Sequence, residues 1–218
     1  MSHSLYRYGT REDLEHDWTV ICISSAGINS EGCGPKIGQF FRFCNKHHAV
    51  SMGSNLTSDL LVGDREMFLA QDWNNPKIMA GQACFDKEDD IAGLLSDMKE
   101  ADLGLSVVVS GLIDRVDHIC KCVGTKHHTV SASLGVWGDI SKLPPPEVLS
   151  ITTMCGHGMI SANRVYDAVE KIRKGRTTPE KASLEMATDC VCGIFNAHRC
   201  AKLLRVLAGS TPQKEPAE

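Results

Sequence analysis

The sequence predicts an α/β protein: two pseudo-repeated βαβ units on a mostly parallel sheet, followed by a C-terminal helical segment that carries cysteine turns. Short β-branched apolar runs alternate with stretches of helical periodicity, which is typical of βαβ units. Residues 20–29 also align without gaps with residues 105–114, and a Lys-His-His motif at 46–48 returns at 126–128. A helical crossover joins parallel strands, so the repeat indicates a parallel sheet.

The first unit is expected to run from a strand over 18–25, through a glycine-rich loop, to a helix that Pro35 opens. The second unit is expected to run from a strand over 105–110, through a helix that ends at Gly124, to a strand that begins at Lys126. The other elements expected in this part of the chain are a polar arm over 1–17, strands over 49–52 and 78–85, and a helix over 89–100.

A proline triplet at 144–146 separates an α/β body over 1–143 from a helical, cysteine-bearing segment over 144–208. Proline lacks an amide proton, so the triplet is predicted to be a stiff connector that is not helical. Beyond it we expect three helices, over 163–173, from Thr178 onward, and over 197–207. A disordered tail is expected over 209–218.

The formal net charge is −4, with 42% hydrophobic and 23% charged residues. Without a basic excess, we expect no nucleic-acid partner. No apolar run reaches the length of about 18 residues that a membrane span needs, and residues 1–7 lack the apolar core of a signal peptide. The expectations are therefore no membrane association and a cytoplasmic location.

Ten cysteines are more than packing requires in such a chain. Without an export signal, metal ligation or reactive thiols explain this number better than disulfides do. Cys33 lies in a Gly-Cys-Gly loop and is expected to be exposed, as a nucleophile or a further ligand. Four others lie in apolar or half-apolar contexts and are predicted to be small buried hydrophobes, namely Cys22, Cys44, Cys84 and Cys120.

Three further cysteines lie in two glycine-rich turns that each precede a helix: Cys155 in the first, and Cys190 and Cys192 in the second. Thiolates select zinc, copper(I) or iron–sulfur clusters, and helix-start amides would stabilise their negative charge. We predict that these three cysteines hold a [4Fe–4S] cluster. The alternative is zinc, and His157, Cys200 and Cys33 are the candidates for a fourth ligand.

Two loops follow expected strands, at the end of a parallel sheet where ligands bind. Ser25 and Asn29 in the first loop, and Ser110 and Asp114 in the second, are candidates to hold a polar substrate. Turn formation and helix capping explain the same residue types equally well. His157 is the first candidate to move a proton, and Asp114 and Ser110 are the further catalytic candidates.

Three cysteines on a four-iron cluster leave one iron open, which can act as a Lewis acid. The expected function is therefore a non-redox lyase, of the hydro-lyase or carbon–sulfur lyase type, that acts on a small polar substrate. The alternatives are a redox or electron-transfer iron–sulfur protein and a zinc-dependent binding module without turnover. We also expect a homodimer with the cysteine segment near the subunit boundary, because the last helix carries an apolar face of Leu203, Leu204 and Leu207.

Overall fold

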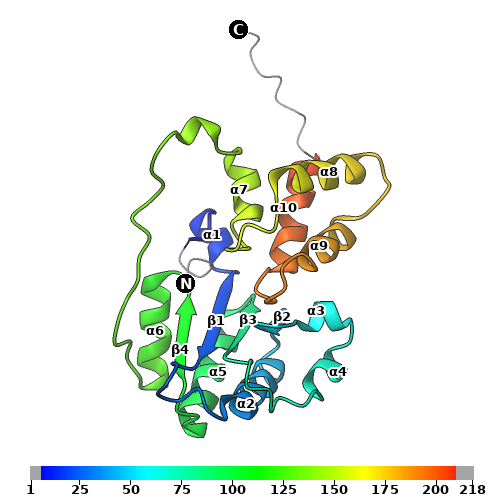
Figure 1. The fold of residues 1–218 in the computed structure, drawn as a ribbon. Coiled ribbons are helices and arrows are strands. Elements are labelled where there is room, and N and C mark those ends of the chain that lie inside the picture. Colours follow the sequence, from blue (N-terminus) through cyan, green and yellow to red (C-terminus); the bar gives the residue numbers. More distant parts are fainter. Residues whose placement is uncertain (1–5, 210–218) are drawn as a thin grey trace.

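The computed structural model of this chain describes residues 6–209 and, within them, one four-stranded sheet (Figure 1). The strands are β1 (Trp18–Ile23), β2 (Ser51–Ser54), β3 (Ala80–Phe85) and β4 (Ser106–Ser110). Their order is β2-β3-β1-β4, and each neighbouring pair is antiparallel. The protein is α/β as predicted, but the prediction of a mostly parallel sheet with two βαβ units is wrong.

The helical crossovers that indicated parallel pairing exist, but each of them skips a strand. Helix α2 (Cys33–Lys46) leads from β1 to β2, and α5 (Glu88–Ala101) leads from β3 to β4. Because β3 lies between β1 and β2, and β1 lies between β3 and β4, the strands that a helix joins are parallel but not adjacent. This is the split βαβ, or ferredoxin-like, arrangement. Alternating strand and helix patterns do not encode which strands pair.

The second predicted unit also lacks its last strand. Helix α6 (Ile113–Val123) follows β4 as expected and ends at Gly124. Residues 125–139, however, form neither helix nor strand, and a short 3-10 helix (Ile140–Lys142) follows them. Every residue from 124 to 143 is exposed.

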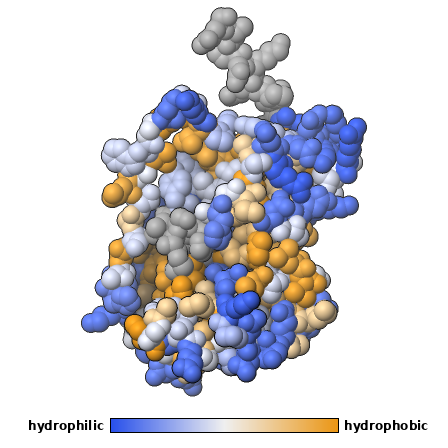
Figure 2. Space-filling model, viewed as in Figure 1, coloured by the Kyte–Doolittle hydropathy of each residue, from blue (hydrophilic) through white to orange (hydrophobic). Residues whose placement is uncertain are grey.

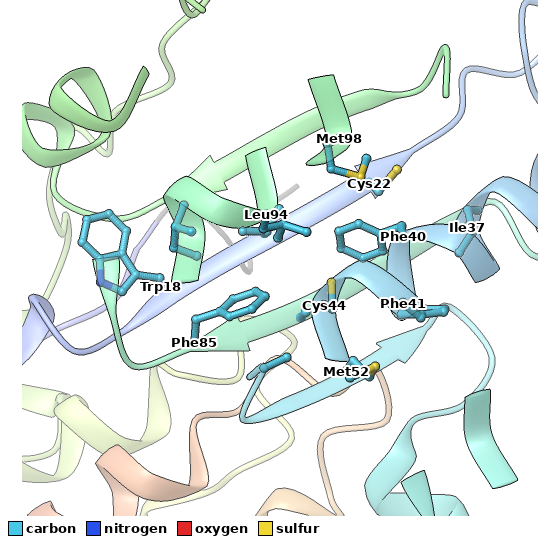
Figure 3. Packing of buried hydrophobic residues seen from close by; sticks show 14 of the residues in the cluster. Trp18, Cys22, Ile37, Phe40, Phe41, Cys44, Met52, Phe85, Leu94 and Met98 are labelled. Carbon is cyan, nitrogen blue, oxygen red and sulfur yellow. The ribbon is translucent and has the colours of Figure 1, made fainter. Parts of the chain in front are cut away.

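Helices α2, α5 and α6 supply the apolar side chains that pack on one face of the sheet and form the first hydrophobic core. Figure 3 shows Phe40 from α2 and Leu94 and Met98 from α5 close to the strands that they cover. These residues recur at helical spacing, so one face of each helix is apolar. Trp18 and Cys22 reach the same core from β1, because side chains at every second position of a strand share a face.

Three short helices complete this part of the chain. Helix α1 (Arg11–Leu14) lies in the N-terminal arm, of which residues 1–5 are outside the described range. Helices α3 (Asp59–Val62) and α4 (Arg65–Leu69) lie in the connection from β2 to β3. The side chains of Thr10, Ser58 and Asp64 cap them by accepting hydrogen bonds from backbone amides of the first turn.

The C-terminal segment consists of α7 (Pro146–Thr152), α8 (Ala162–Arg173), α9 (Pro179–Ala187) and α10 (Ala197–Gly209), which form a second hydrophobic core. The proline triplet is not wholly outside helix, since Pro146 is the first residue of α7, where a missing amide proton costs little. Of the tail that was expected to be disordered, only Gly209 lies within the described residues, and it ends α10.

The apolar face of α10 is covered by its own chain. Leu204 is fully buried in the second core, and Leu203 and Leu207 pack against that core. This face therefore does not need a second copy to cover it, contrary to the reasoning from the sequence. Within residues 6–209, no helix is both long enough and apolar enough to span a bilayer.

Candidate metal site

Two turns of the C-terminal segment bring three cysteines together, as the sequence predicted. Cys155 lies between α7 and α8, and Cys190 and Cys192 lie between α9 and α10. All three side chains are buried. The sulfur of Cys190 lies 3.8 Å from that of Cys192 and shares a hydrogen bond with the thiol of Cys155. The Nδ1 atom of His157, an exposed residue, lies 3.9 Å from the sulfur of Cys192.

Hydrogen bonds link the three thiols in a row, from Cys155 to Cys190 and from Cys190 to Cys192, and these bonds change the pKa values of the thiols. The hydrogen bond with Cys190, followed by burial, raises the pKa of Cys155 far above its ordinary value. For Cys190, the bond with Cys155 lowers the pKa, but the bond with Cys192 and burial together raise it to about 11. The pKa of Cys192 is lowered, because the hydrogen bonds from Cys190 and from the Ile194 amide outweigh burial. Cys192 is therefore the first of the three to become a thiolate.

Backbone amides of the turns themselves face the sulfurs: those of His157 and Met159 at Cys155, and that of Ile194 at Cys190 and Cys192. The prediction from the sequence is that helix-start amides stabilise the thiolates. The side chains of Ser161 and Asn196 instead accept hydrogen bonds from the helix-start amides of α8 and α10, at Arg164 and Arg199. Successive amides in the turns provide the partial positive charge that a thiolate needs.

Direct backbone contact holds the second turn against strand β2. Gly193 has a φ of +70°, and a Cβ atom there would lie 2.6 Å from the carbonyl carbon of Met52. A Cβ atom on Gly53 would lie 2.7 Å from the carbonyl oxygen of Cys192. Both separations are too short for any side chain, so glycine is required on each side of this contact. The hydroxyl of Ser51 donates a hydrogen bond to the carbonyl oxygen of Gly193 at 2.6 Å.

The N-terminal arm contacts both cysteine turns. Arg7 donates from Nη2 to the carbonyl oxygen of Ile194 at 2.7 Å, two residues after Cys192. The amide of Tyr8 donates to the hydroxyl of Thr153 at 2.9 Å, two residues before Cys155. The buried Arg7 cation also interacts electrostatically with the Cys190 thiol. The Nε atom of Arg7 has no hydrogen-bond partner among the described residues.

Asp17 neutralises Arg7 and links it to the last helix. Nη1 of Arg7 donates to both carboxylate oxygens of Asp17, at 2.7 and 2.8 Å, and Nη1 of Arg199 donates to the same carboxylate at 2.8 Å. The side-chain amide of Asn196 donates to Asp17 and to Asp86, at 3.3 and 3.0 Å. The sequence did not indicate this network, because its partners lie as many as 187 positions apart and follow no periodic pattern.

A pocket of about 390 Å³ adjoins the first cysteine turn. Its walls combine the N-terminal arm, the end of the exposed connection, α7, the turn itself and the start of α8. None of these residues carries a charged side chain; they are Tyr6, Pro144, Leu149, Thr152, Thr153, Cys155, Gly156, Gly158, Ile160 and Ala162. Cys155 therefore belongs both to the thiol cluster and to a space of the size that small-molecule sites have.

The two loops predicted to hold a substrate lie at opposite ends of the sheet. Because β1 and β4 are antiparallel, Ile23 pairs with Ser106 at one end and Thr19 pairs with Ser110 at the other. Four strand positions span roughly 13 Å. Ser25 and Asn29, which follow β1, are therefore separated by the length of the strand from Ser110 and Asp114, and no small substrate can touch both sets.

The local contacts of these loops are those of turns and surface ion pairs. Asn29 closes its own loop by accepting a hydrogen bond from the Ser25 amide at 2.6 Å. Its side-chain amide also donates to the carbonyl oxygen of Gly104, in the loop before β4, at 2.7 Å. Asp114 is exposed and forms an ion pair with Arg11 of α1. Two of the four proposed substrate ligands, Asn29 and Asp114, thus have side chains with other structural roles.

Of the seven other cysteines, all except the exposed Cys122 are buried. Exposed fractions of 0% at Cys22, Cys44 and Cys84 and of 9% at Cys120 confirm the prediction for those four. Cys33, expected to be exposed, is also buried, and its thiol donates to the carbonyl oxygen of Ile78 at 3.1 Å. Burial in the second core raises the pKa of Cys200 strongly. All ten cysteines of the chain are free.

The sulfurs of the cysteine turns touch one another, as thiols do, and do not surround a common centre. Accordingly, no group of three or more His, Cys, Asp or Glu side chains in the described range is arranged to hold a metal ion as it stands. Metal binding at these turns requires the thiols to lose their protons and the sulfurs to turn toward the metal.

This chain matches no protein-family model, no curated protein and no solved structure.

Proposed function

We propose that this protein is an iron–sulfur-dependent lyase of the non-redox type, in which Cys155, Cys190 and Cys192 hold a [4Fe–4S] cluster beside the pocket. One observation carries the proposal: Cys155 is shared between the buried thiol cluster and the wall of the pocket. A cluster with three cysteine ligands has one iron without a protein ligand. Because Cys155 also lines the pocket, a cluster that it holds would lie beside a space that accepts a small molecule.

A cluster held by Cys155, Cys190 and Cys192 would supply Lewis acidity to a substrate hydroxyl or sulfur. The carbon–oxygen or carbon–sulfur bond breaks with its electron pair leaving on the heteroatom, and a base takes the proton from the neighbouring carbon. The carbon–hydrogen electron pair becomes the new double bond, so no external oxidant or reductant is needed. His157 is the proposed base, supported by its exposure and by its place between Gly156 and Gly158, which line the pocket. The wall of the pocket has no charged side chain, so it offers no ionic partner to a substrate carboxylate.

A closed zinc site is the second candidate, and the separation of one pair of donors, the sulfurs of Cys190 and Cys192, supports it. A tetrahedral zinc ion with zinc–sulfur bonds of about 2.3 Å keeps two sulfur ligands about 3.8 Å apart, and a sulfur and a nitrogen ligand about 3.5 Å apart. The sulfurs of Cys190 and Cys192 are 3.8 Å apart, and Nδ1 of His157 lies 3.9 Å from the second. With His157 as the fourth ligand, the protein would be a zinc-dependent binding module without turnover.

Metal content after anaerobic purification separates the two candidates. The lyase proposal expects brown protein with about four iron and about four sulfide per chain. Reduction should give an EPR signal that shifts when a small hydroxy acid or thiol is added, because only an open iron accepts a ligand. An unshifted signal would indicate a fully ligated electron carrier, and colourless protein with one zinc would favour the binding module.

Variants then assign the ligands. Cys155→Ala, Cys190→Ala and Cys192→Ala should each lose the cluster, whereas the matched control Cys122→Ala, at an exposed cysteine, should retain it. His157→Gln separates the candidates a second time. It should keep iron and lose turnover if His157 is the base, and it should lose zinc if His157 is the fourth ligand.

We further propose a cytoplasmic protein that acts on a small molecule as a homodimer. Ten free cysteines support a reducing compartment. The net charge of −4 gives no support to a nucleic-acid partner.

A further inference from the structure

The exposed connection between α6 and α7 contains a strand sequence that has no sheet. From Thr129 to Val136, polar and apolar residues alternate, with Val130, Ala132, Leu134 and Val136 on one side. This period of two is typical of a strand with one buried face. Yet the exposed fractions are 53% at Val130, 88% at Leu134 and 43% at Val136. Figure 2 shows hydrophobic residues at the margin of the molecule where Figure 1 places this connection.

Strand β4 lacks a neighbouring strand on one side, and so complements a strand sequence that has no sheet. It lies at the end of the sheet and pairs, among the described strands, with β1 alone. It contains three consecutive valines, Val107 to Val109, but none of its five residues is buried, whereas each of the other three strands is almost wholly buried. An apolar edge strand with an open side is a template for pairing with another strand.

Within one chain, the connection that contains residues 129–136 and strand β4 lie on opposite sides of helix α6. Helix α6 packs on α5 and β4, and Figure 1 shows the connection running along the side of α6 that faces away from β4. Pairing within the chain would require the connection to move across this helix. A connection of 19 residues (125–143) with so little regular structure is also longer than loops in compact domains usually are, which indicates a function for it.

We infer that residues 129–136 of each chain pair with β4 of a second copy and extend its sheet by a fifth strand. The apolar row would continue the half-buried row of Val107 and Val109, and polar Ser131 and Ser133 would take the other face. Each copy offers one strand and one edge, so a two-fold axis satisfies both at once and closes the assembly as a dimer. This inference stands independently of the metal, because neither segment contains a cysteine of the turns.

Leu134→Asp tests the inference in the full-length protein, with Ser133→Asp as the matched control on the opposite face. Light scattering should give twice the chain mass for the wild type and for Ser133→Asp at micromolar concentrations. Leu134→Asp should raise the dimer dissociation constant by about 100-fold or more, because each dimer would bury two carboxylates in place of two leucines. Leu134 is 88% exposed in the single chain, so circular dichroism of the variant should match that of the wild type.

Hydrogen exchange of the wild type gives a readout that does not depend on any variant. Amides of residues 129–136 and of β4 should become protected together as the concentration rises and lose protection together on dilution. A wild type that stays monomeric overturns the inference, as does a dimer that Leu134→Asp leaves intact. Protection of 129–136 that is independent of concentration would mean pairing within the chain, and protection without β4 would mean another docking site; both also overturn it. None of these results bears on iron or zinc content.

Discussion

Arg199 and Asp17 form a buried ion pair that joins the last helix to the residue before the first strand. Nη1 of Arg199 lies 2.8 Å from Oδ2 of Asp17, and the two side chains are 1% and 0% exposed. The same carboxylate binds Arg7, which donates to the carbonyl oxygen of Ile194 beside the second cysteine turn. One buried carboxylate thus holds the arm, the turn and the C-terminal helices in a common position.

Replacing this carboxylate should cost far more than replacing an exposed one. Asp17→Asn leaves the cations of Arg7 and Arg199 buried with too little negative charge, so we expect a loss of about 3–5 kcal/mol in the free energy of unfolding. Asp114→Asn removes a partner of Arg11 at a side chain that is 59% exposed, and should cost far less, because water screens an exposed ion pair. Urea unfolding measures both values. Equal losses would show that Asp17 does not join the two parts.

Gly193→Ala should displace the second cysteine turn from β2. The new Cβ atom would lie 2.6 Å from the Met52 carbonyl carbon, so the backbone must move. Gly175→Ala is the matched control: its φ is +66°, close to the +70° of Gly193, but nothing lies within 4 Å of its Cβ position. Overpacking should make Gly193→Ala less stable than the control by about 1–3 kcal/mol. It should also make the turn cysteines more reactive toward a thiol reagent, and a control equally reactive would contradict this.

Alkaline pH should destabilise the protein through Cys84, which lies in β3 where the sheet contacts the C-terminal segment. Burial, the largest cause, raises its pKa from 9.0 to about 12. The native state therefore keeps this proton while the unfolded state loses it. The resulting contribution to stability is complete below pH 9 and disappears as pH rises to about 12; at about 1.4 kcal/mol per pH unit it amounts to about 4 kcal/mol.

The measurement compares urea unfolding at about pH 8 and about pH 11 for the wild type, Cys84→Ala and the exposed-site control Cys122→Ala. Titrations that all three share cancel in the comparison. Cys84→Ala should lose less stability between the two pH values than the wild type does, and Cys122→Ala should lose as much. An identical loss in all three would mean that the Cys84 thiol ionises as easily in the folded protein as in the unfolded one.

Metal binding at the cysteine turns should release protons and strengthen as pH rises. The pKa of Cys190 is about 11 and that of Cys155 is also raised, so both are thiols at neutral pH and both must ionise to bind. Titrating the metal-free protein with cadmium in an unbuffered solution near pH 7 should release at least about two protons per ion, one each from Cys155 and Cys190. Cys155→Ala should release about one proton fewer, and release that this variant leaves unchanged would remove Cys155 from the site.

Much of the local structure could be predicted from the sequence. Apolar residues at helical spacing, such as Ile37, Phe40 and Phe41 in α2, identified the crossover helices, and the glycine-rich context of Cys155 and Cys190 identified the two turns. These features depend on residues close in the chain, where backbone geometry alone relates one position to the next.

Strand neighbours and the long-range polar contacts were decided by the tertiary structure. A strand–helix–strand pattern is satisfied whether the two strands touch or a third strand lies between them, and here β3 lies between β1 and β2. The antiparallel sheet then separates Ser25 from Ser110 by the length of a strand. Asp17 meets Arg199 across 182 positions. Hydrophobic periodicity determines which face of an element is buried but not what it is buried against, and that choice depends on how all the elements pack together.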